Sequence, residues 1–145
     1  MMEFPAVNYL GVLAAAASAF VLGGLWYSPA LFAKKWMAYT GHGDCDSEEG
    51  KANKGNTGLI FGGAFLLSVI AAYVFAMLIP AGELGPKYGA IAGAMTGFAF
   101  GATSFGISYL FEQRPFGLWL INGGYHMFQF TLYGLVLGLM GPVAV

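Results

Sequence analysis

Residues 116–140 read FGLWLINGGYHMFQFTLYGLVLGLM, an apolar run that carries polar residues at regular intervals. The polar residues recur at the i, i+4, i+7 and i+11 spacing that places them on one helix face: Asn122, His126, Gln129 and Tyr133. A buried polar group costs about 2–7 kcal/mol unless it finds a hydrogen-bond partner. The run therefore predicts a helix that is packed among other helices, with its polar face turned toward them.

The composition of the chain indicates a membrane protein. Hydrophobic residues make up 58% of the sequence and charged residues only 9%, and the mean hydropathy is +0.68. A soluble domain would have about 25% charged residues. The six Lys and Arg residues are too few and too scattered to form the basic patch of a nucleic-acid-binding protein. The one cysteine, Cys45, excludes an internal disulfide and a cysteine-rich metal site.

The chain contains four apolar segments that are long enough to cross a membrane. About 20 helical residues span a hydrocarbon core of roughly 30 Å, and the predicted spans are residues 7–26, 58–79, 88–110 and 116–140. The predicted fold is therefore an all-α integral membrane protein, a multi-pass four-helix transmembrane bundle that forms a single domain over residues 1–145. A short interfacial helix is expected between residues 31 and 39, followed by a polar loop over residues 40–56.

Small residues indicate where these helices approach each other. In the third span, glycine recurs at every fourth position as a glycine zipper of overlapping G-x-x-x-G motifs: Gly89, Gly93, Gly97 and Gly101. The first span has small residues on one face: Gly11, Ala15 and Ala19. We expect these two stripes to pack against each other.

The end of the first span has a distinctive sequence, GGLWYSP over residues 23–29. Pro29 disfavours helix at Ser28, and Trp26 and Tyr27 have the aromatic rings that prefer the headgroup zone. Together with Asn8 and Gly11 before it and Trp36 after it, this signature resembles the domain-of-unknown-function family numbered 1761, and the later spans resemble it too. The resemblance implies a small polytopic membrane protein, and it supplies no catalytic residues.

The polar loop over residues 40–56 has acidic residues that invite comparison with a calcium loop. An EF-hand needs Gly at its sixth position and Glu at its twelfth, but counting from Asp44 these positions hold Glu49 and Gly55. The loop is better interpreted as solvated, with a capped short helix that begins near Asp46 or Ser47. No metal and no cofactor is expected.

The distribution of Lys and Arg predicts the orientation of the spans. The loop of residues 27–57 and the loop of residues 111–115 together hold five positive residues: Lys34, Lys35, Lys51, Lys54 and Arg114. Lys87 is the one positive residue on the other side. The positive-inside rule therefore places both loops in the cytoplasm and both termini on the non-cytoplasmic side of a cell membrane.

The sequence contains no catalytic motif, and an enzyme is not expected. It lacks a Gly-x-Ser-x-Gly elbow and an HExxH motif, and it has no pair of carboxylates within a span. The expected function is that of a structural or accessory component of a membrane assembly. Its partners would be the lipid bilayer and a second copy of itself or another membrane protein.

His126 leaves three interpretations open. It can belong to a structural seam of hydrogen bonds, line a path for a small solute, ion or proton, or hold a bound cofactor. A haem or copper site would need a second strong ligand, which the sequence does not place nearby. In each case we expect the polar face of residues 116–140 to point toward Asn8, Trp26 or the hydroxyls of Thr96 and Thr103.

Overall fold

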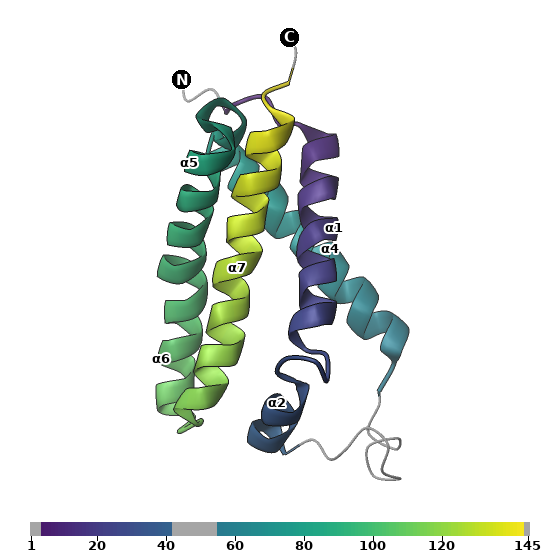
Figure 1. The fold of residues 1–145 in the computed structure, drawn as a ribbon, viewed down its shortest axis with the longest axis vertical. Helices are drawn as coiled ribbons and strands as arrows, with labels where there is room; N and C mark the ends of the chain where they lie inside the picture. The colour runs from purple at the N-terminus through teal and green to yellow at the C-terminus, as the bar shows by residue number, and fades with distance from the viewer. Residues whose placement is uncertain (1–3, 42–54, 144–145) are drawn as a thin grey trace.

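The computed structural model describes residues 4–41 and 55–143, and all regular structure within these ranges is helical. In chain order the elements are α1 (Tyr9–Trp26), α2 (Ala33–Thr40), α4 (Thr57–Leu78), α5 (Ala81–Thr96), the π-helix η1 (Gly97–Ala102), α6 (Thr103–Phe111) and α7 (Phe116–Met140). Figure 1 shows α1, α7 and the α5 to α6 helix running side by side, with α4 crossing them at an incline. The two ends of the chain lie at the same end of the bundle.

Helix α7 is the centre of the bundle, because it contacts every other described helix. Its bounds coincide with the predicted span of residues 116–140. Pro115, in an extended conformation, precedes its first turn, and Gly141 ends it with a φ of 75°. With 25 residues, α7 is about 37 Å long.

The third predicted span begins at residue 88, but helix α5 already begins at Ala81. The chain breaks within this helix at Gly85, whose φ of 79° is accessible to glycine without strain. Pro86 follows directly, and its fixed φ suits the first turn of the helix that continues from there. Apart from this break at Gly85, α5, η1 and α6 follow one another without a gap and form one stretch of 31 residues, Ala81–Phe111.

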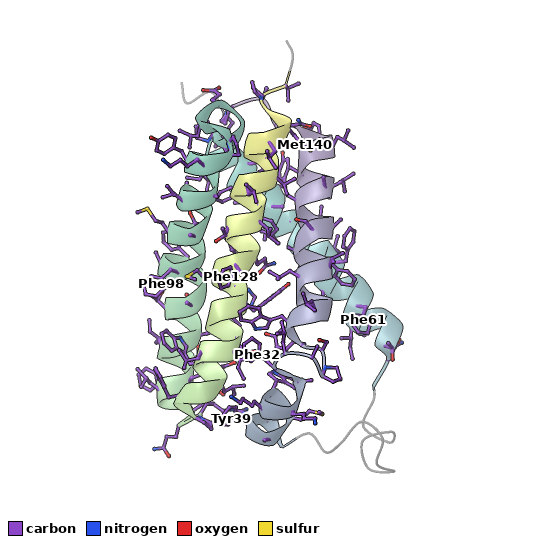
Figure 2. The ribbon with its side chains drawn as sticks, viewed as in Figure 1. Phe32, Tyr39, Phe61, Phe98, Phe128 and Met140 are labelled. Carbon is purple, nitrogen blue, oxygen red and sulfur yellow. The ribbon has the colours of Figure 1, made fainter. Side chains whose placement is uncertain are left out.

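Three of the described helices are long and apolar enough to cross a membrane: α1, α4 and the stretch Ala81–Phe111. The sequence predicted four. Helix α7 has the length but not the apolar composition, because Asn122, His126 and Gln129 lower its hydropathy. The bundle exposes many large apolar side chains, and Figure 2 shows Phe61 and Phe98 projecting outward from it, 56% and 51% exposed.

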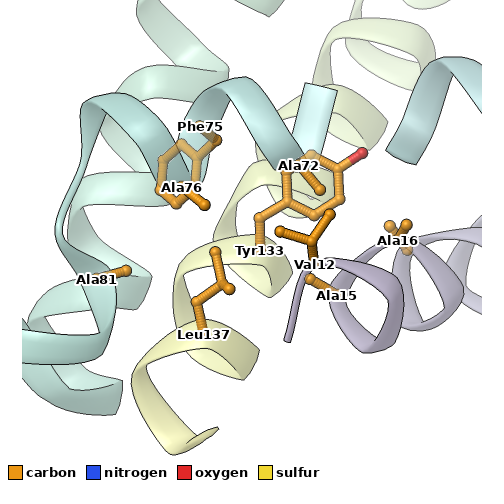
Figure 3. Close-up of a cluster of buried hydrophobic side chains, with 10 residues drawn as sticks. Val12, Ala15, Ala16, Ala72, Phe75, Ala76, Ala81, Tyr133 and Leu137 are labelled. Atoms are coloured by element: carbon orange, nitrogen blue, oxygen red, sulfur yellow. The ribbon is translucent and has the colours of Figure 1, made fainter. Parts of the chain in front are cut away.

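Tyr133 lies at the centre of the apolar core, where its side chain is fully buried. Figure 3 shows it between Val12 and Ala15 of α1 and Ala72 of α4, with Leu137 one turn further along α7. Alanine on the two neighbouring helices lets both approach the tyrosine ring closely. The core therefore joins α1, α4 and α7 around one aromatic side chain.

The glycine stripe of the third span packs against α7, so the expected pairing with the first span is wrong. A Cβ on Gly89 would meet the backbone of Gly134, and one on Gly93 would meet the carbonyl oxygen of Phe130. A Cβ on Gly97 would lie 2.7 Å from the carbonyl oxygen of His126. At Gly89, Gly93 and Gly97 the backbones of the two helices meet directly, which requires positions without side chains at the interface.

The small-residue face of α1 also turns toward α7. Gly11, Ala15 and Ala19 are all buried, and a Cβ on Gly11 would lie 3.1 Å from the side chain of Leu137. Both stripes therefore have the same partner, because α7 stands between the two helices that carry them.

Helix α2 lies where the sequence predicts a short interfacial helix, at the end of the bundle opposite the termini. It has contacts with α7. The predicted short helix near Asp46 lies outside the described residues.

Candidate functional site

Three of the predicted polar residues of α7 form a chain of hydrogen bonds along the helix. The Nδ1 atom of His126 lies 2.7 Å from Oε1 of Gln129, and Nε2 of Gln129 donates to the hydroxyl of Tyr133 at 2.6 Å. Gln129 and Tyr133 are buried, and His126 is partly buried. We call this group, with the Ser68 residue described next, the polar seam.

The seam crosses from α7 to α4 at Ser68. The hydroxyl oxygens of Tyr133 and Ser68 are 2.7 Å apart, and the Tyr133 hydroxyl also donates to the carbonyl oxygen of Ser68 at 3.1 Å. Sequence reasoning missed Ser68. The sequence does contain a signal for it, because Ser68 is a hydroxyl residue in the middle of an apolar segment, where a hydroxyl group often bonds to a neighbouring helix.

Asn122 belongs to a separate group, one turn closer to the α2 end of the bundle. Its side-chain amide donates to the Tyr109 hydroxyl at 2.7 Å, and its oxygen accepts a hydrogen bond from the Tyr27 hydroxyl at 2.7 Å. Burial raises the pKa of the Tyr27 phenol well above its ordinary value, so Tyr27 stays protonated and remains a donor. Asn122 thereby links α7 to α6 and to the end of α1.

The aromatic signature after the first span packs against α7. The indole nitrogen of Trp26 donates to the carbonyl oxygen of Ile121 at 3.0 Å, and its ring lies 4.8 Å from that of Phe32. Ser28 caps the turn by donating to a carbonyl of its own segment before Pro29. The Tyr27 ring is 6.1 Å from that of Trp36, so the signature holds α1, α2 and α7 together.

Other expected partners of the polar face lie elsewhere. Asn8 is the N-cap of α1, where its side chain accepts from the Gly11 amide at 2.9 Å and donates to the carbonyl oxygen of Gly141 at 3.4 Å. The hydroxyls of Thr96 and Thr103 donate to carbonyls one turn earlier in their own helix. The predicted contact of these three residues with the seam is therefore wrong.

The π-helix η1 adjoins the seam. Its last carbonyl, on Ala102, accepts a hydrogen bond from the indole of Trp119 at 2.7 Å. Gly106 lets this indole approach, because a Cβ there would lie 2.9 Å from the indole nitrogen. One turn after η1, Phe105 stacks on the His126 ring at 4.8 Å, nearly parallel to it. Single π-turns within α-helices often occur at functional sites.

The seam contains no charged residue. Within residues 4–41 and 55–143, no group of three or more His, Cys, Asp or Glu residues is placed to hold a metal ion. The ion pair between Arg114 and Glu112, at 3.1 Å, is exposed at the end of the bundle. Every buried side-chain nitrogen or oxygen in the described part of the chain has a hydrogen-bond partner.

A cavity of about 340 Å³ opens beside the seam, between α4 and α7. His126 and Gln129 lie in its wall, with Ser68 of α4 and Phe20 of α1. Most of its lining is apolar. The site thus combines an apolar cavity with a small set of hydrogen-bonding groups.

The fold and the site define an all-helical protein with helices of membrane-spanning length and an internal polar seam. The chain belongs to the family described as "Protein of unknown function (DUF1761)", whose match covers residues 10–138. The resemblance inferred from the GGLWYSP signature is thereby confirmed. No curated protein and no solved structure matches the chain.

Proposed function

We propose that this protein is a four-helix integral membrane protein in which α7 is the fourth crossing. Three helices have the length and composition of membrane spans, and α7 runs beside two of them over about 37 Å. Its buried polar residues, Gln129 and Tyr133, face the other helices, so they would not meet lipid. Resistance of the protein to extraction by alkaline carbonate tests the membrane location, and release into the supernatant contradicts it.

We further propose that both termini lie on the non-cytoplasmic side. Lys34 and Lys35 on α2 lie at the end of the bundle opposite the termini, together with Arg114 after α6. The positive-inside rule favours the cytoplasm for that end. A reporter enzyme that works only outside the cytoplasm is expected to be active when fused after Val145. Activity of a cytoplasmic reporter at the same position would invert the topology.

The role that we propose is that of a structural or accessory component of a membrane assembly, without an enzymatic activity. The observation that carries this proposal is that the polar residues of the seam form hydrogen bonds within the protein. His126, Gln129 and Tyr133 form a chain of hydrogen bonds along α7, and Tyr133 at its end bonds to Ser68, which ties α7 to α4. Such a seam fixes the register of two helices, with each bond contributing about 0.6 kcal/mol.

The second candidate function is permeation of a small solute, an ion or a proton. The observation that favours it is the cavity of about 340 Å³, which has His126 in its wall. Histidine changes its charge between about pH 5 and 8, and it often serves as a proton carrier. The two functions differ in whether a solute, an ion or a proton passes along the seam.

Proton flux into liposomes distinguishes the two functions. The purified protein is reconstituted with a pH-sensitive dye inside the vesicles, and a pH step is applied. The structural role predicts the same flux for the parent protein, for His126→Gln and for empty vesicles. A leak that appears with the parent and disappears with His126→Gln would replace the structural role by permeation.

A further inference from the structure

The cavity beside the seam has the size and position of a small-molecule site. Its volume of about 340 Å³ is at the lower end of the range for such sites. Apolar side chains of α1 and α4 form one wall, including Phe20, Ala64 and Leu67, and His126 lies in the opposite wall on α7. Phe20 and Leu67 are exposed at the outer surface of the bundle, so the cavity borders the surface that would face lipid.

The seam determines which nitrogen of His126 carries its proton. The Gln129 amide uses its nitrogen to donate to Tyr133, so its oxygen faces His126. An amide oxygen only accepts hydrogen bonds, and Nδ1 of His126 must therefore be the donor. In a neutral imidazole with a proton on Nδ1, the other nitrogen, Nε2, is a hydrogen-bond acceptor.

The second ring nitrogen, Nε2, belongs to a side chain that lines the cavity. It has no hydrogen bond to any described residue, whereas every fully buried side-chain nitrogen or oxygen in the described chain has one. Nε2 is therefore accessible. The ring itself is held in place, with Phe105 stacked on it at 4.8 Å and the edge of Tyr125 at 5.1 Å.

These observations define the chemistry of the occupant. An apolar lining selects an apolar molecule, and no charged side chain lines the cavity to balance a charged one. The accessible acceptor on His126 selects a molecule with a hydrogen-bond donor. The other polar side chains of the wall already have hydrogen-bond partners within the protein: Gln129 and Ser68 within the seam, and Tyr125, whose hydroxyl donates to the carbonyl oxygen of Ala19 at 3.2 Å.

We propose that this cavity binds an uncharged lipophilic alcohol that enters from the bilayer, with its hydroxyl donating to Nε2 of His126. Lipid tails are as apolar as the cavity wall, so transfer of the alkyl chain from the bilayer would change its free energy little, and the hydrogen bond to Nε2 would favour the bound state. The hydroxyl would supply orientation and selectivity over molecules that cannot donate. The proposal rests on the membrane location proposed above and is independent of whether the protein is structural or conducts a solute.

Binding of radiolabelled 1-dodecanol to the full-length protein in lipid nanodiscs tests the proposal. Empty nanodiscs measure partition into the lipid. We expect saturable binding above this background, at about one molecule for each protein. Dodecyl methyl ether has the same chain but no donor, and we expect it to compete about tenfold more weakly, as the loss of one hydrogen bond predicts.

Three variants separate the cavity from the seam. His126→Phe keeps the stacked ring and removes the acceptor together with the Nδ1 donor to Gln129, so it should weaken dodecanol binding about tenfold, and the Ala64→Phe change tests the cavity with the seam intact. Ala64→Phe fills the cavity from α4 without touching the seam, and it should abolish saturable binding. Ala17→Phe is the matched control, because Ala17 is exposed on α1 and does not line the cavity. It should bind like the parent.

The proposal is overturned if dodecanol shows no saturable binding, if the ether competes equally well, or if Ala64→Phe binds like Ala17→Phe. His126→Phe is checked for folding by size-exclusion chromatography in detergent. If it fails to fold, the comparison of Ala64→Phe with Ala17→Phe and the competition by the ether still test the proposal. Carbonate extraction tests the membrane location separately. A failure of the binding proposal is therefore distinguishable from a failure of the location.

Discussion

Replacing Gly97 by alanine should separate α7 from the helix that carries Gly97. The added Cβ would lie 2.7 Å from the carbonyl oxygen of His126 and 2.8 Å from the Cα atom of Met127. Comfortable contacts between such atoms begin at about 3.5 Å, so the two backbones would have to move apart by roughly 0.8 Å. No side chain can rotate away to relieve this contact, because both neighbours are backbone atoms.

The expected loss of stability is about 1–2 kcal/mol. Overpacking of a close contact typically costs about 1–3 kcal/mol. Alanine in place of glycine within a helix offsets about 0.4–1 kcal/mol of this by restricting the unfolded chain. The separation would also weaken the contacts of Gly93 and Gly101, which lie one turn away on either side of Gly97 on the same contact face.

Equilibrium unfolding in mixed micelles with increasing SDS measures this loss. The matched control is Gly62→Ala on α4, because nothing lies within 4 Å of the Cβ position of Gly62. The control should be as stable as the parent or slightly more stable. If Gly97→Ala unfolds at the same SDS fraction as Gly62→Ala, the close contact of α7 with the glycine stripe is refuted.

Two further predictions use the same unfolding measurement. Tyr133→Phe should destabilise the protein by about 1–3 kcal/mol, since it leaves the buried Gln129 amide without its acceptor. Combined with Ser68→Ala it should cost less than the sum of the two single changes, and strict additivity would argue against the bond between them. Trp119→Phe should cost about 1 kcal/mol by removing the hydrogen bond from its indole to the Ala102 carbonyl at the end of η1. No loss there would mean that another group satisfies this carbonyl.

The sequence predicted those features that depend on local chemistry. The bounds of α7 follow from Pro115 before it and Gly141 after it, and both signals are visible in the sequence. The spacing of glycine in the third span predicted a close backbone contact on one face. Spacing shows which residues share a face, but it contains no information about the helix that the face will meet. The expected partner was α1, and the structure has α7.

The partners of the polar residues could not be predicted either, because residue spacing does not identify the neighbouring helix. Tyr27, Ser68 and Tyr109 come from three different helices or helix ends, and Tyr27 and Ser68 lie 95 and 65 residues from the α7 residues that they bond. The π-helix was also beyond sequence reasoning, because π and α windings differ locally by one residue in the hydrogen-bond pattern. Glycine and phenylalanine at residues 97–101 are compatible with both.

The low hydropathy of α7 follows from its central position. A helix that faces lipid must be apolar on its outer side, and α1, α4 and the stretch Ala81–Phe111 have this property. In α7, Asn122, His126 and Gln129 have hydrogen-bond partners within the protein, which offsets the cost of burying them, although Leu120 and Phe128 of the same helix are exposed. Hydropathy thus identifies the helices on the outside of such a bundle and misses the one at its centre. The polar composition of α7 is therefore compatible with the proposal that it is a fourth crossing.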